Sequence, residues 1–522
     1  MAFKEKWRRI ILDLSDIVLS KNLYFSLSFL GYISLSNLIS PMRILPFILA
    51  SLLFSKMVFA QKQEVRAKNI LIIYSDDQSY HALGAAGNKE ISTPNLDKLA
   101  ESGLMFTQAH VMGGHQGAVC IPSRAMLLTG RYVNRLPSDG STIPDSLVSL
   151  PELLREKGYN TYHTGKWHSD KSSHNRMFNL GGDIFFGGMH FPEFGGQEHP
   201  TVYLFDSTGV YDEKRKRTSN TYSTTLYAEN AIRFLSSSIA QSRPFFCYVA
   251  FTSPHDPRTP PEKFERMYDP AKISLPANFL SKHPFDNGDL NVRDEKLLPV
   301  PRDPNAIKKD IALYYGMVSE MDAQVGRILE ALEKNGLVEN TLIVFAGDNG
   351  LAMGQHGLLG KQNLYEHSIR VPMILSGPGV PINKKTDGFT YLSDITPTII
   401  DYLQLTRPAS VEGISLLPIL QDPTKKVRSS IYNVYGHWSR SIKTDDGFKM
   451  IVYNVDGITT TQLFNLKNDP LEITDLSKDP NYQGKVLEMR NLLKQQMADT
   501  FDNLQIDLPN WGRNKNQKSR GS

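Results

Sequence analysis

The chain has 522 residues, of which 40% are hydrophobic and 21% charged, an ordinary composition for a globular protein. This length suits one large domain with a small one beside it, or two to three domains of ordinary size. The formal net charge of +4 lies wholly in the first sixty residues, where seven Lys or Arg stand against three Asp or Glu. The remainder is neutral, which excludes a nucleic-acid-binding protein that works through a basic surface.

Residues 1–60 have the pattern of a leader. Met42 and Arg43 open a short apolar run that ends in small residues at Ala60. A basic start, about ten apolar residues and a small-residue cleavage site are typical of a secretory signal peptide, and the run is too short for a membrane span. We therefore expect a signal peptide at 42–60 with cleavage after Ala60, translation from Met42, and a periplasmic or secreted protein without a stable membrane anchor in the mature chain. An N-terminal anchor is the alternative.

Apolar runs rich in β-branched residues alternate with helical patterns through most of the chain. Strands are expected at 69–74, 104–110, 159–164, 245–251 and 341–346. Helices are expected at 93–100, 150–157, 222–235 and 307–335. This alternation predicts an α/β fold with a large, mostly parallel sheet sandwiched by helices.

Two segments lack periodicity. Residues 181–200 are rich in Gly and Phe and are expected to form a long loop over the site, and residues 257–304 read as an irregular insertion rich in Pro and charge. After residue 424 the pattern changes to three strands, at 431–435, 448–453 and 462–464, and a helix at 485–501. We therefore expect a catalytic domain at 61–424, a C-terminal α+β subdomain at 425–505 and a flexible tail at 506–522.

Polar side chains follow three of the expected strands directly: Asp76 and Asp77, His255, and Asp348 with Asn349. Any one of these clusters alone is most often a solvated pair or a turn. Because ligands gather at the carboxyl ends of strands in an open α/β sheet, three clusters at one edge predict a site. The two acidic clusters offer hard oxygen ligands, which favour Ca²⁺, or Mg²⁺ as second choice, over zinc.

Cys120 lies between a Gly-rich segment and an apolar, helix-like run. A lone Cys is most often a small buried hydrophobe, which is our interpretation of Cys247, the other cysteine of the chain. The segment Cys120-Ile121-Pro122-Ser123-Arg124, followed by Leu128-Thr129-Gly130-Arg131, changes that interpretation. It resembles the signature of the type I sulfatases of the alkaline-phosphatase-like superfamily, in which the Cys is oxidised to formylglycine (3-oxoalanine).

The resemblance extends from residue 69 to about residue 480. The further matches stand in the family's order: Asp76-Asp77, Gly165-Lys166-Trp167-His168, Ser253-Pro254-His255, Asp348-Asn349-Gly350, Gly354-Gln355-His356-Gly357, Gly360-Lys361 and Leu463-Phe464-Asn465-Leu466. The Cys segment is highly specific, whereas each of the others is weak alone.

The resemblance implies a metal-assisted mechanism. A formylglycine hydrate carries two hydroxyls on one carbon, of which one attacks sulfur and the other then releases sulfate by re-forming the aldehyde. Asp76, Asp77, Asp348 and Asn349 would hold Ca²⁺, together with the modified Cys120.

The resemblance also gives roles to the charged residues around the nucleophile. Arg124 would hold formylglycine and the metal carboxylates in place, and Lys166 and Lys361 would neutralise charge on the sulfate. His255 is the candidate acid for the leaving oxygen and His168 the candidate base, and the two roles can be exchanged.

Two further histidines are candidates for contact with substrate. His356 lies between the metal turn and Lys361 and is expected at the sugar, while His115 has equal claims to contact substrate or to orient the loop before Cys120.

We therefore expect an enzyme that hydrolyses sulfate esters on a carbohydrate, such as oligosaccharides from algal polysaccharides like ulvan or from glycosaminoglycans. Its partners would be the sulfated carbohydrate and a formylglycine-generating or sulfatase-maturating enzyme. The alternatives are a phosphonate or phosphate ester hydrolase of the same superfamily and a non-catalytic glycan-binding relic.

Overall fold

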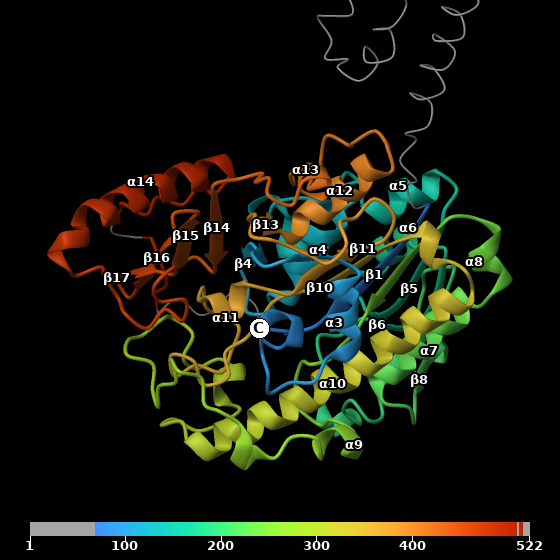
Figure 1. Ribbon diagram of the computed structural model, residues 1–522, viewed down its shortest axis with the longest axis horizontal. Coiled ribbons are helices and arrows are strands. Elements are labelled where there is room, and N and C mark those ends of the chain that lie inside the picture. Colours follow the sequence, from blue (N-terminus) through green and yellow to red (C-terminus); the bar gives the residue numbers. More distant parts are fainter. Residues whose placement is uncertain (1–67, 509–510, 515–522) are drawn as a thin grey trace, which may run out of the picture. The chain divides into compact units, whose positions relative to one another are not determined.

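The computed structural model describes residues 68–508 and 511–514. The leader at 1–60, including the expected signal peptide at 42–60, lies outside the described residues, and so does the end of the tail at 515–522. The fold is built around one ten-stranded sheet with helices on both faces (Figure 1). Its strands, in spatial order, are β12 (Lys384–Thr386), β2 (Gly103–Phe106), β11 (Met373–Ser376), β10 (Thr341–Gly347), β1 (Asn69–Ser75), β9 (Phe245–Ala250), β5 (Asn160–Lys166), β6 (Leu180–Phe185), β7 (Thr201–Leu204) and β8 (Lys216–Thr218).

The middle of this sheet is parallel, as the alternating pattern predicts. β10, β1, β9, β5 and β6 all run in one direction, whereas β11 and β7 join them antiparallel. The sheet is therefore mixed, with a parallel centre. All residues of β1, β9 and β10 are buried, since helices cover both faces.

Each face of the sheet has its own hydrophobic cluster. On one face, Leu71 and Val249 belong to the cluster that also holds side chains of α3 (Pro94–Glu101), α7 (Ser223–Leu235) and α10 (Pro304–Lys334). On the other face, Ile72 and Tyr248 belong to the cluster of α4 (Cys120–Thr129), α5 (Leu150–Glu156), α6 (Lys171–Met177), α12 (Ile395–Tyr402) and α13 (Leu417–Gln421). The shorter helices are α8 (Ser238–Ser242), α9 (Glu262–Glu265) and α11 (Glu366–Ile369).

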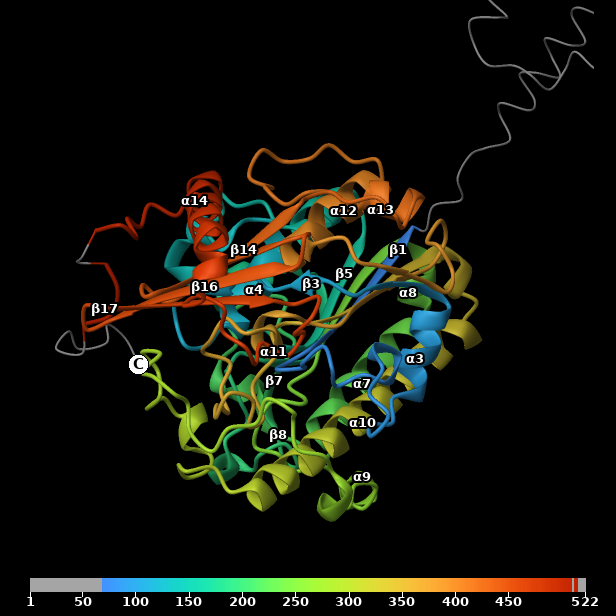
Figure 2. The same ribbon diagram turned by 60° about the vertical axis from the view of Figure 1, so that its left-hand side comes forward.

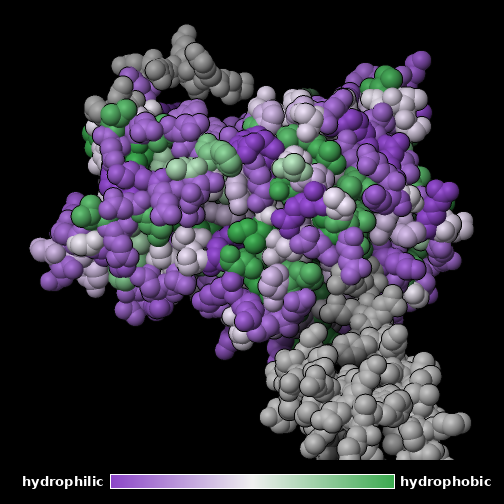
Figure 3. Space-filling model, turned by 90° about the horizontal axis from the view of Figure 1, so that it is seen from above, coloured by the Kyte–Doolittle hydropathy of each residue, from purple (hydrophilic) through white to green (hydrophobic). Residues whose placement is uncertain are grey.

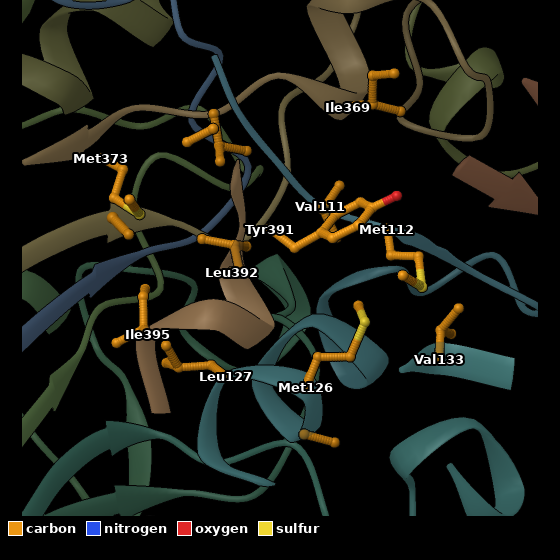
Figure 4. Close-up of a cluster of buried hydrophobic side chains, with 14 of the residues drawn as sticks. Val111, Met112, Met126, Leu127, Val133, Ile369, Met373, Tyr391, Leu392 and Ile395 are labelled. Carbon is orange, nitrogen blue, oxygen red and sulfur yellow. The ribbon is translucent and has the colours of Figure 1, made fainter. Parts of the chain in front are cut away.

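Helix α4, which begins at Cys120, is anchored by apolar packing behind the nucleophile position. Met126 and Leu127 of this helix pack in the cluster that contains Tyr391, Leu392 and Ile395 (Figure 4). All five side chains are buried, so a change in the position of α4 would cost apolar burial of about 25 cal/mol per Å² exposed. This packing fixes the helix that carries Cys120.

A second, five-stranded sheet forms the C-terminal part, seen edge-on beside the first sheet in Figure 2. Its order is β17 (Ile458–Asn465), β16 (Phe448–Val455), β15 (Ser439–Thr444), β14 (Ser430–Tyr435) and β4 (Gly113–Gly114), and α14 (Gln483–Asp499) packs on β14, β15 and β16. The edge strand β4 comes from the loop that leads to Cys120, so this sheet joins that loop to the C-terminal part of the chain. A two-stranded pair, β3 (Ala109–His110) with β13 (Thr390–Tyr391), completes the sheets.

One expectation needs correction. The segment 181–200 is not a loop throughout, because β6 occupies Leu180–Phe185; the Gly181-Gly182 pair has low strand propensity and concealed it. In the described part of the tail, Trp511 is buried and the backbone of Arg513 pairs with that of strand β16, and the flexibility of the tail stays a prediction.

The surface agrees with a chain of ordinary composition. Hydrophilic residues cover most of the face shown in Figure 3, and hydrophobic ones lie in small separate patches. Within the described ranges, no helix has the length and apolar character needed to cross a membrane.

Candidate active site

Parallel pairing brings the two acidic turns together. Ser75, the last residue of β1, lies opposite Gly347, the last residue of β10, so Asp76-Asp77 and Asp348-Asn349 leave the sheet side by side. Asp77 has a φ of 63°, a left-handed conformation that Asp tolerates better than most residues. This turn directs its backbone N–H to Asp348 Oδ1 at 2.9 Å.

The remaining predicted residues reach the same edge from neighbouring elements. Lys166 is the last residue of β5, and His255 follows β9, the strand between β5 and β1. Cys120 is the first residue of α4, and Lys361 lies in the loop after the Asp348 turn. The sheet therefore gathers residues that are up to 285 positions apart in the chain.

The oxygen atoms of the two acidic turns fit a hard cation. Asp76 Oδ1 and Asn349 Oδ1 are fully buried, and no hydrogen-bond donor in the described part of the chain reaches them. Ligand atoms of Asp76, Asp348 and Cys120 lie within 4.8 Å of one another. Buried oxygens without partners are costly unless something binds them, and this donor set suits Ca²⁺ or Mg²⁺. Asp77, the remaining predicted ligand, accepts a hydrogen bond from Asn349 Nδ2 at 2.7 Å.

Three buried cations balance the carboxylates. Lys166 Nζ lies 2.6 Å from Asp76 Oδ2, and Arg124 Nη2 lies 2.9 Å from Asp348 Oδ2. Burial opposes ionisation of Asp76, but the Lys166 ammonium holds the pKa of this carboxyl well below its usual range. Burial and the neighbouring charge of Asp76 raise the pKa of Asp348, against the pull of Arg124. Because the pKa of Asp348 is raised and that of Asp76 is lowered, a cation that binds here is expected to displace a proton from Asp348.

Lys361 neutralises Asp77, the second carboxylate of the Asp76-Asp77 turn. Its Nζ lies 2.8 Å from Asp77 Oδ1, and both side chains are nearly fully buried. Burial lowers the pKa of Lys361, but Asp77 outweighs it and the pKa lies well above its usual value, so the amine stays charged.

Cys120 lies at the centre of these charges. Its Sγ is 3.3 Å from His168 Nδ1 and 3.6 Å from Lys166 Nζ, and the residue is 1% exposed. Burial raises the pKa of the thiol despite Lys166 and Lys361, so the side chain is not a thiolate near neutral pH. A thiol that stays protonated is a weak nucleophile, so the residue as encoded is not activated.

The two histidines differ in their surroundings. His168 is buried beside Lys166, and both effects lower its pKa well below the usual value, so the ring is neutral. His255 Nε2 lies 3.5 Å from Asp77 Oδ2, and its Nδ1 lies 2.8 Å from the carbonyl oxygen of Asp256. One ring is thus a neutral neighbour of Cys120, and the other faces carboxylates.

Ser123 has a structural role that the sequence did not indicate. Its hydroxyl lies 2.6 Å from the carbonyl oxygen of Asp348 and 2.8 Å from the Tyr74 hydroxyl. Arg124, the next residue, donates to the carbonyl oxygen of Lys166 at 3.2 Å and lies over the Tyr74 ring. The first turn of α4 therefore connects the Asp348-Asn349 turn to the end of β5 by hydrogen bonds.

The loop between β6 and β7, residues 186–200, lies over both histidines, as expected for the second part of the 181–200 segment. Gln197 Nε2 donates to the carbonyl oxygen of His255 at 3.3 Å. Gly188 approaches His168 so closely that a Cβ at this position would lie 2.9 Å from His168 Nε2. Because Gly188 has no Cβ, the His168 ring can occupy the space next to it.

Gly188→Ala is expected to lower kcat by about tenfold or more, because the added methyl displaces the His168 ring from Cys120. The matched control is Gly484→Ala, where a Cβ has no neighbour within 4 Å. Steady-state rates of the ester hydrolysis that the sequence predicts check the pair. An unchanged kcat in Gly188→Ala would show that the position of His168 is not critical.

The structure does not bring the two candidate substrate histidines to the nucleophile. His115 Nε2 lies 3.0 Å from Asn134 Oδ1 and its Nδ1 lies 3.4 Å from the carbonyl oxygen of Gly436, which favours the loop-orienting role. His356 stacks on Tyr365 at 4.0 Å between ring centroids. In the described ranges, no hydrogen bond or ring contact joins either histidine to Cys120 or the predicted metal ligands, and a contact of either one with substrate stays a prediction.

The 257–304 insertion supplies residues that sequence reasoning missed. Arg293 and Asp294 reach the vicinity of His255 and Lys361, through Asp256 and Gln362. Asp256 could have been suspected from its place beside His255, whereas nothing in the sequence marks Arg293 or Asp294, because they lie in a segment without periodicity.

A cavity of about 260 Å³ lies elsewhere in the fold. Tyr314, His367 and Leu471 are among its lining residues, and none of the predicted site residues is. The Tyr314 hydroxyl donates to the carbonyl oxygen of Asp77 at 2.9 Å. Tyr314 therefore lies between the cavity and the Asp77 turn, although the lining of the cavity does not include Cys120 or the predicted metal ligands.

Comparison with known proteins gives consistent matches over most of the chain. The sulfatase family model matches residues 68–405, and a model described as N-sulphoglucosamine sulphohydrolase, C-terminal, matches residues 354–499. An N-acetylglucosamine-6-O-sulfatase of Bacteroides thetaiotaomicron is 25% identical, over 87% of this chain and 90% of its own length. An ulvan-active sulfatase of Formosa agariphila is 25% identical, over 85% of this chain and 83% of its own length.

A solved structure supports the fold. A protein in complex with its substrate D-glucosamine-2-N,6-O-disulfate has a TM-score of 0.68 and 22% identity, covering 84% of this chain and 99% of that chain.

Proposed function

The chain belongs to the sulfatase family, with its alkaline-phosphatase-like α/β fold, and on this premise we propose that it hydrolyses sulfate esters of a carbohydrate through a formylglycine made from Cys120. One observation carries the proposal. The Cys120 side chain is buried within 3.6 Å of a lysine and 3.3 Å of a neutral histidine, beside oxygen atoms that lack partners.

The modified residue would supply the nucleophile that the thiol does not. In the hydrated aldehyde, one hydroxyl would lose its proton and attack sulfur as the sulfur–oxygen bond to the sugar breaks; the second would then lose its proton, the carbon–oxygen bond to sulfate would break and the aldehyde would re-form. Addition of one water would regenerate the hydrate for the next turnover. No oxidant is consumed in turnover, since oxidation occurs once, when a formylglycine-generating or sulfatase-maturating enzyme modifies Cys120.

The oxygen ligands would hold the metal. Asp76, Asp77, Asp348 and Asn349, with the side chain of residue 120, suit Ca²⁺ in preference to Mg²⁺, because Ca²⁺ accepts many protein oxygens whereas Mg²⁺ keeps several waters and is usually held by one or two carboxylates. When bound, the cation would lower the pKa of the attacking hydroxyl and polarise the sulfate oxygens. In the structure, Lys166 and Lys361 pair with Asp76 and Asp77, and a bound sulfate would compete for the same ammonium groups.

The surroundings of the two histidines support one order of roles. His168 adjoins the side chain of residue 120 and is neutral, which suits the base that takes the proton from the second hydroxyl. His255 turns Nε2 toward Asp77 and is held through Nδ1 by the carbonyl oxygen of Asp256, a fixed position that suits the acid for the leaving sugar oxygen. We therefore assign His168 as base and His255 as acid.

The substrate proposal is a sulfated oligosaccharide from a polysaccharide such as ulvan or a glycosaminoglycan. Its support is the sugar named for two curated relatives and the export expected from the 42–60 segment. We accordingly place the mature protein in the periplasm or outside the cell.

A panel of defined sulfated oligosaccharides tests this function. We expect kcat/KM for at least one of them to exceed that for 4-nitrophenyl phosphate, because each of the three buried cations is paired with a carboxylate, which leaves little excess positive charge for a doubly charged phosphate ester. Sulfate release by ion chromatography is the measurement. A higher kcat/KM for the phosphate ester than for every sulfate ester would instead assign a phosphate or phosphonate ester hydrolase. Binding without release would indicate a glycan-binding relic.

A further inference from the structure

His255, the histidine assigned as acid, is held through its Nδ1 by the next residue, Asp256. His255 Nδ1 lies 2.8 Å from the carbonyl oxygen of Asp256 and 3.2 Å from the carboxylate Oδ1 of the same residue. A carbonyl oxygen can only accept a hydrogen bond, so Nδ1 carries a proton and Nε2 is the atom turned to Asp77. The direction of Nε2 therefore depends on where Asp256 is held.

Asp256 is in turn held by an arginine from the 257–304 insertion. Arg293 Nη1 lies 2.5 Å from Asp256 Oδ2 and Arg293 Nη2 lies 2.9 Å from Asp256 Oδ1, a bidentate pair. Two parallel hydrogen bonds fix the plane and the direction of a carboxylate, which a single charge cannot do. The carboxylate is 9% exposed and the arginine side chain 44% exposed, so Arg293 approaches Asp256 from the solvent side.

Arg293 is itself fixed by the residue that follows it. Asp294 Oδ1 accepts from Arg293 Nη2 at 2.7 Å, and Asp294 Oδ2 accepts from Gln362 Nε2 at 2.8 Å. Gln362 follows Lys361 and also donates to the carbonyl oxygen of Gly117, three residues before Cys120, at 3.1 Å. These hydrogen bonds connect the insertion to the loops on both sides of the nucleophile.

We propose that Arg293 is a positioning residue for the departure of the sugar, which acts by holding Asp256 so that His255 Nε2 points at the leaving oxygen. This inference rests on the proposed function, in which His255 protonates that oxygen. The step moves one proton from His255 Nε2 to the oxygen as the sulfur–oxygen bond breaks, and Arg293 neither gives nor takes a proton. An alkoxide leaving group such as a sugar oxygen needs this proton, whereas a 4-nitrophenolate leaves readily without it.

The leaving group therefore separates a positioning role from a general structural one. Arg293→Ala is expected to lower kcat for a sulfated oligosaccharide by about 10- to 100-fold with KM within about twofold, while kcat for 4-nitrophenyl sulfate falls by less than about threefold. Because Arg293 is reached from solvent, added guanidinium ion should restore part of the lost rate. Arg293→Lys should lie between wild type and Arg293→Ala, since an ammonium cannot make the bidentate contact.

Two reference variants complete the experiment. Arg327 has the same side-chain exposure, 44%, and pairs with Glu229, which is not one of the site residues. Arg327→Ala should therefore leave both rates unchanged. His255→Ala should show the same selective loss as Arg293→Ala, of about 10²-fold or more, without guanidinium rescue.

The outcomes separate the two proposals. Three results with Arg293→Ala would overturn the positioning role while wild-type sugar desulfation stands. They are an equal fall in kcat on the sugar and the aryl substrate, no fall in kcat on either, and no recovery of the sugar rate with guanidinium ion. An absence of sugar desulfation in the wild-type protein would overturn the proposed function itself.

Discussion

Cys120→Ala abolishes sulfate release, with an expected fall in kcat of about 10⁴-fold or more, because the variant lacks the side chain from which the nucleophile is made. The fold should persist. Ala is a better helix former than Cys, and α4 keeps the packing of Met126 and Leu127 that anchors it. Rates of sulfate release and circular dichroism check both halves of this result.

Cys247→Ala is the matched control. Cys247 lies in β9 with no exposed surface, so the same chemical change removes a buried sulfur far from the charged cluster. We expect a loss of stability of about 1 kcal/mol or more from the cavity and an unchanged kcat. Activity in Cys120→Ala equal to that of Cys247→Ala would show that residue 120 does not carry the reaction.

Removal of the divalent cation is expected to have the second-largest effect. A chelator should abolish activity and lower Tm, because a cation present at about 100 times its Kd stabilises the folded state by about 2.7 kcal/mol. The reason lies in Asp76 Oδ1 and Asn349 Oδ1, which are buried without hydrogen-bond partners, and in the crowded carboxylates around them. Ca²⁺ should restore both properties. Full activity in a chelated, metal-free protein would contradict the metal site.

The cation affinity should also depend on pH. The pKa of Asp348 is raised in the folded protein, so this carboxyl tends to hold a proton that the cation must displace. Affinity for Ca²⁺ should therefore rise as pH rises, with release of protons on binding. Calorimetry in two buffers of different ionisation enthalpy measures that release. Asp348→Asn should weaken the dependence of Tm on Ca²⁺.

The parallel centre of the sheet could be predicted from the sequence because its strands are buried on both faces. The runs at β1, β9 and β10 are continuously apolar, and the polar residues that follow them mark the edge where ligands gather. Local sequence thus placed Asp76, His255 and Asp348 at one site, and the pairing of β1 with β10 explains why.

The outer strands could not be predicted in the same way. β6 begins Leu180-Gly181-Gly182, and β15 is a polar segment, Ser439–Thr444, whose place in the second sheet depends on β14 and β16. β4 consists of Gly113 and Gly114 alone. In these elements tertiary pairing decides the conformation, since the residues have little strand propensity of their own.

The functional residues divide along the same line. The fold brings together the predicted residues in motifs next to strands, whereas Arg293 and Asp294 join them through contacts with Asp256 and Gln362 that only the folded chain brings about. The contact of His356 with the sugar stays a prediction; in the fold its ring stacks on Tyr365.

The most direct test of the account is peptide mass spectrometry of the Cys120 segment from protein that releases sulfate from a sugar. The account predicts formylglycine at position 120, seen as the loss of sulfur and two hydrogens with the gain of one oxygen, and labelling of the aldehyde by a hydrazide. The modified fraction should rise and fall with specific activity across preparations. An unmodified Cys120 thiol in a fully active preparation would contradict it.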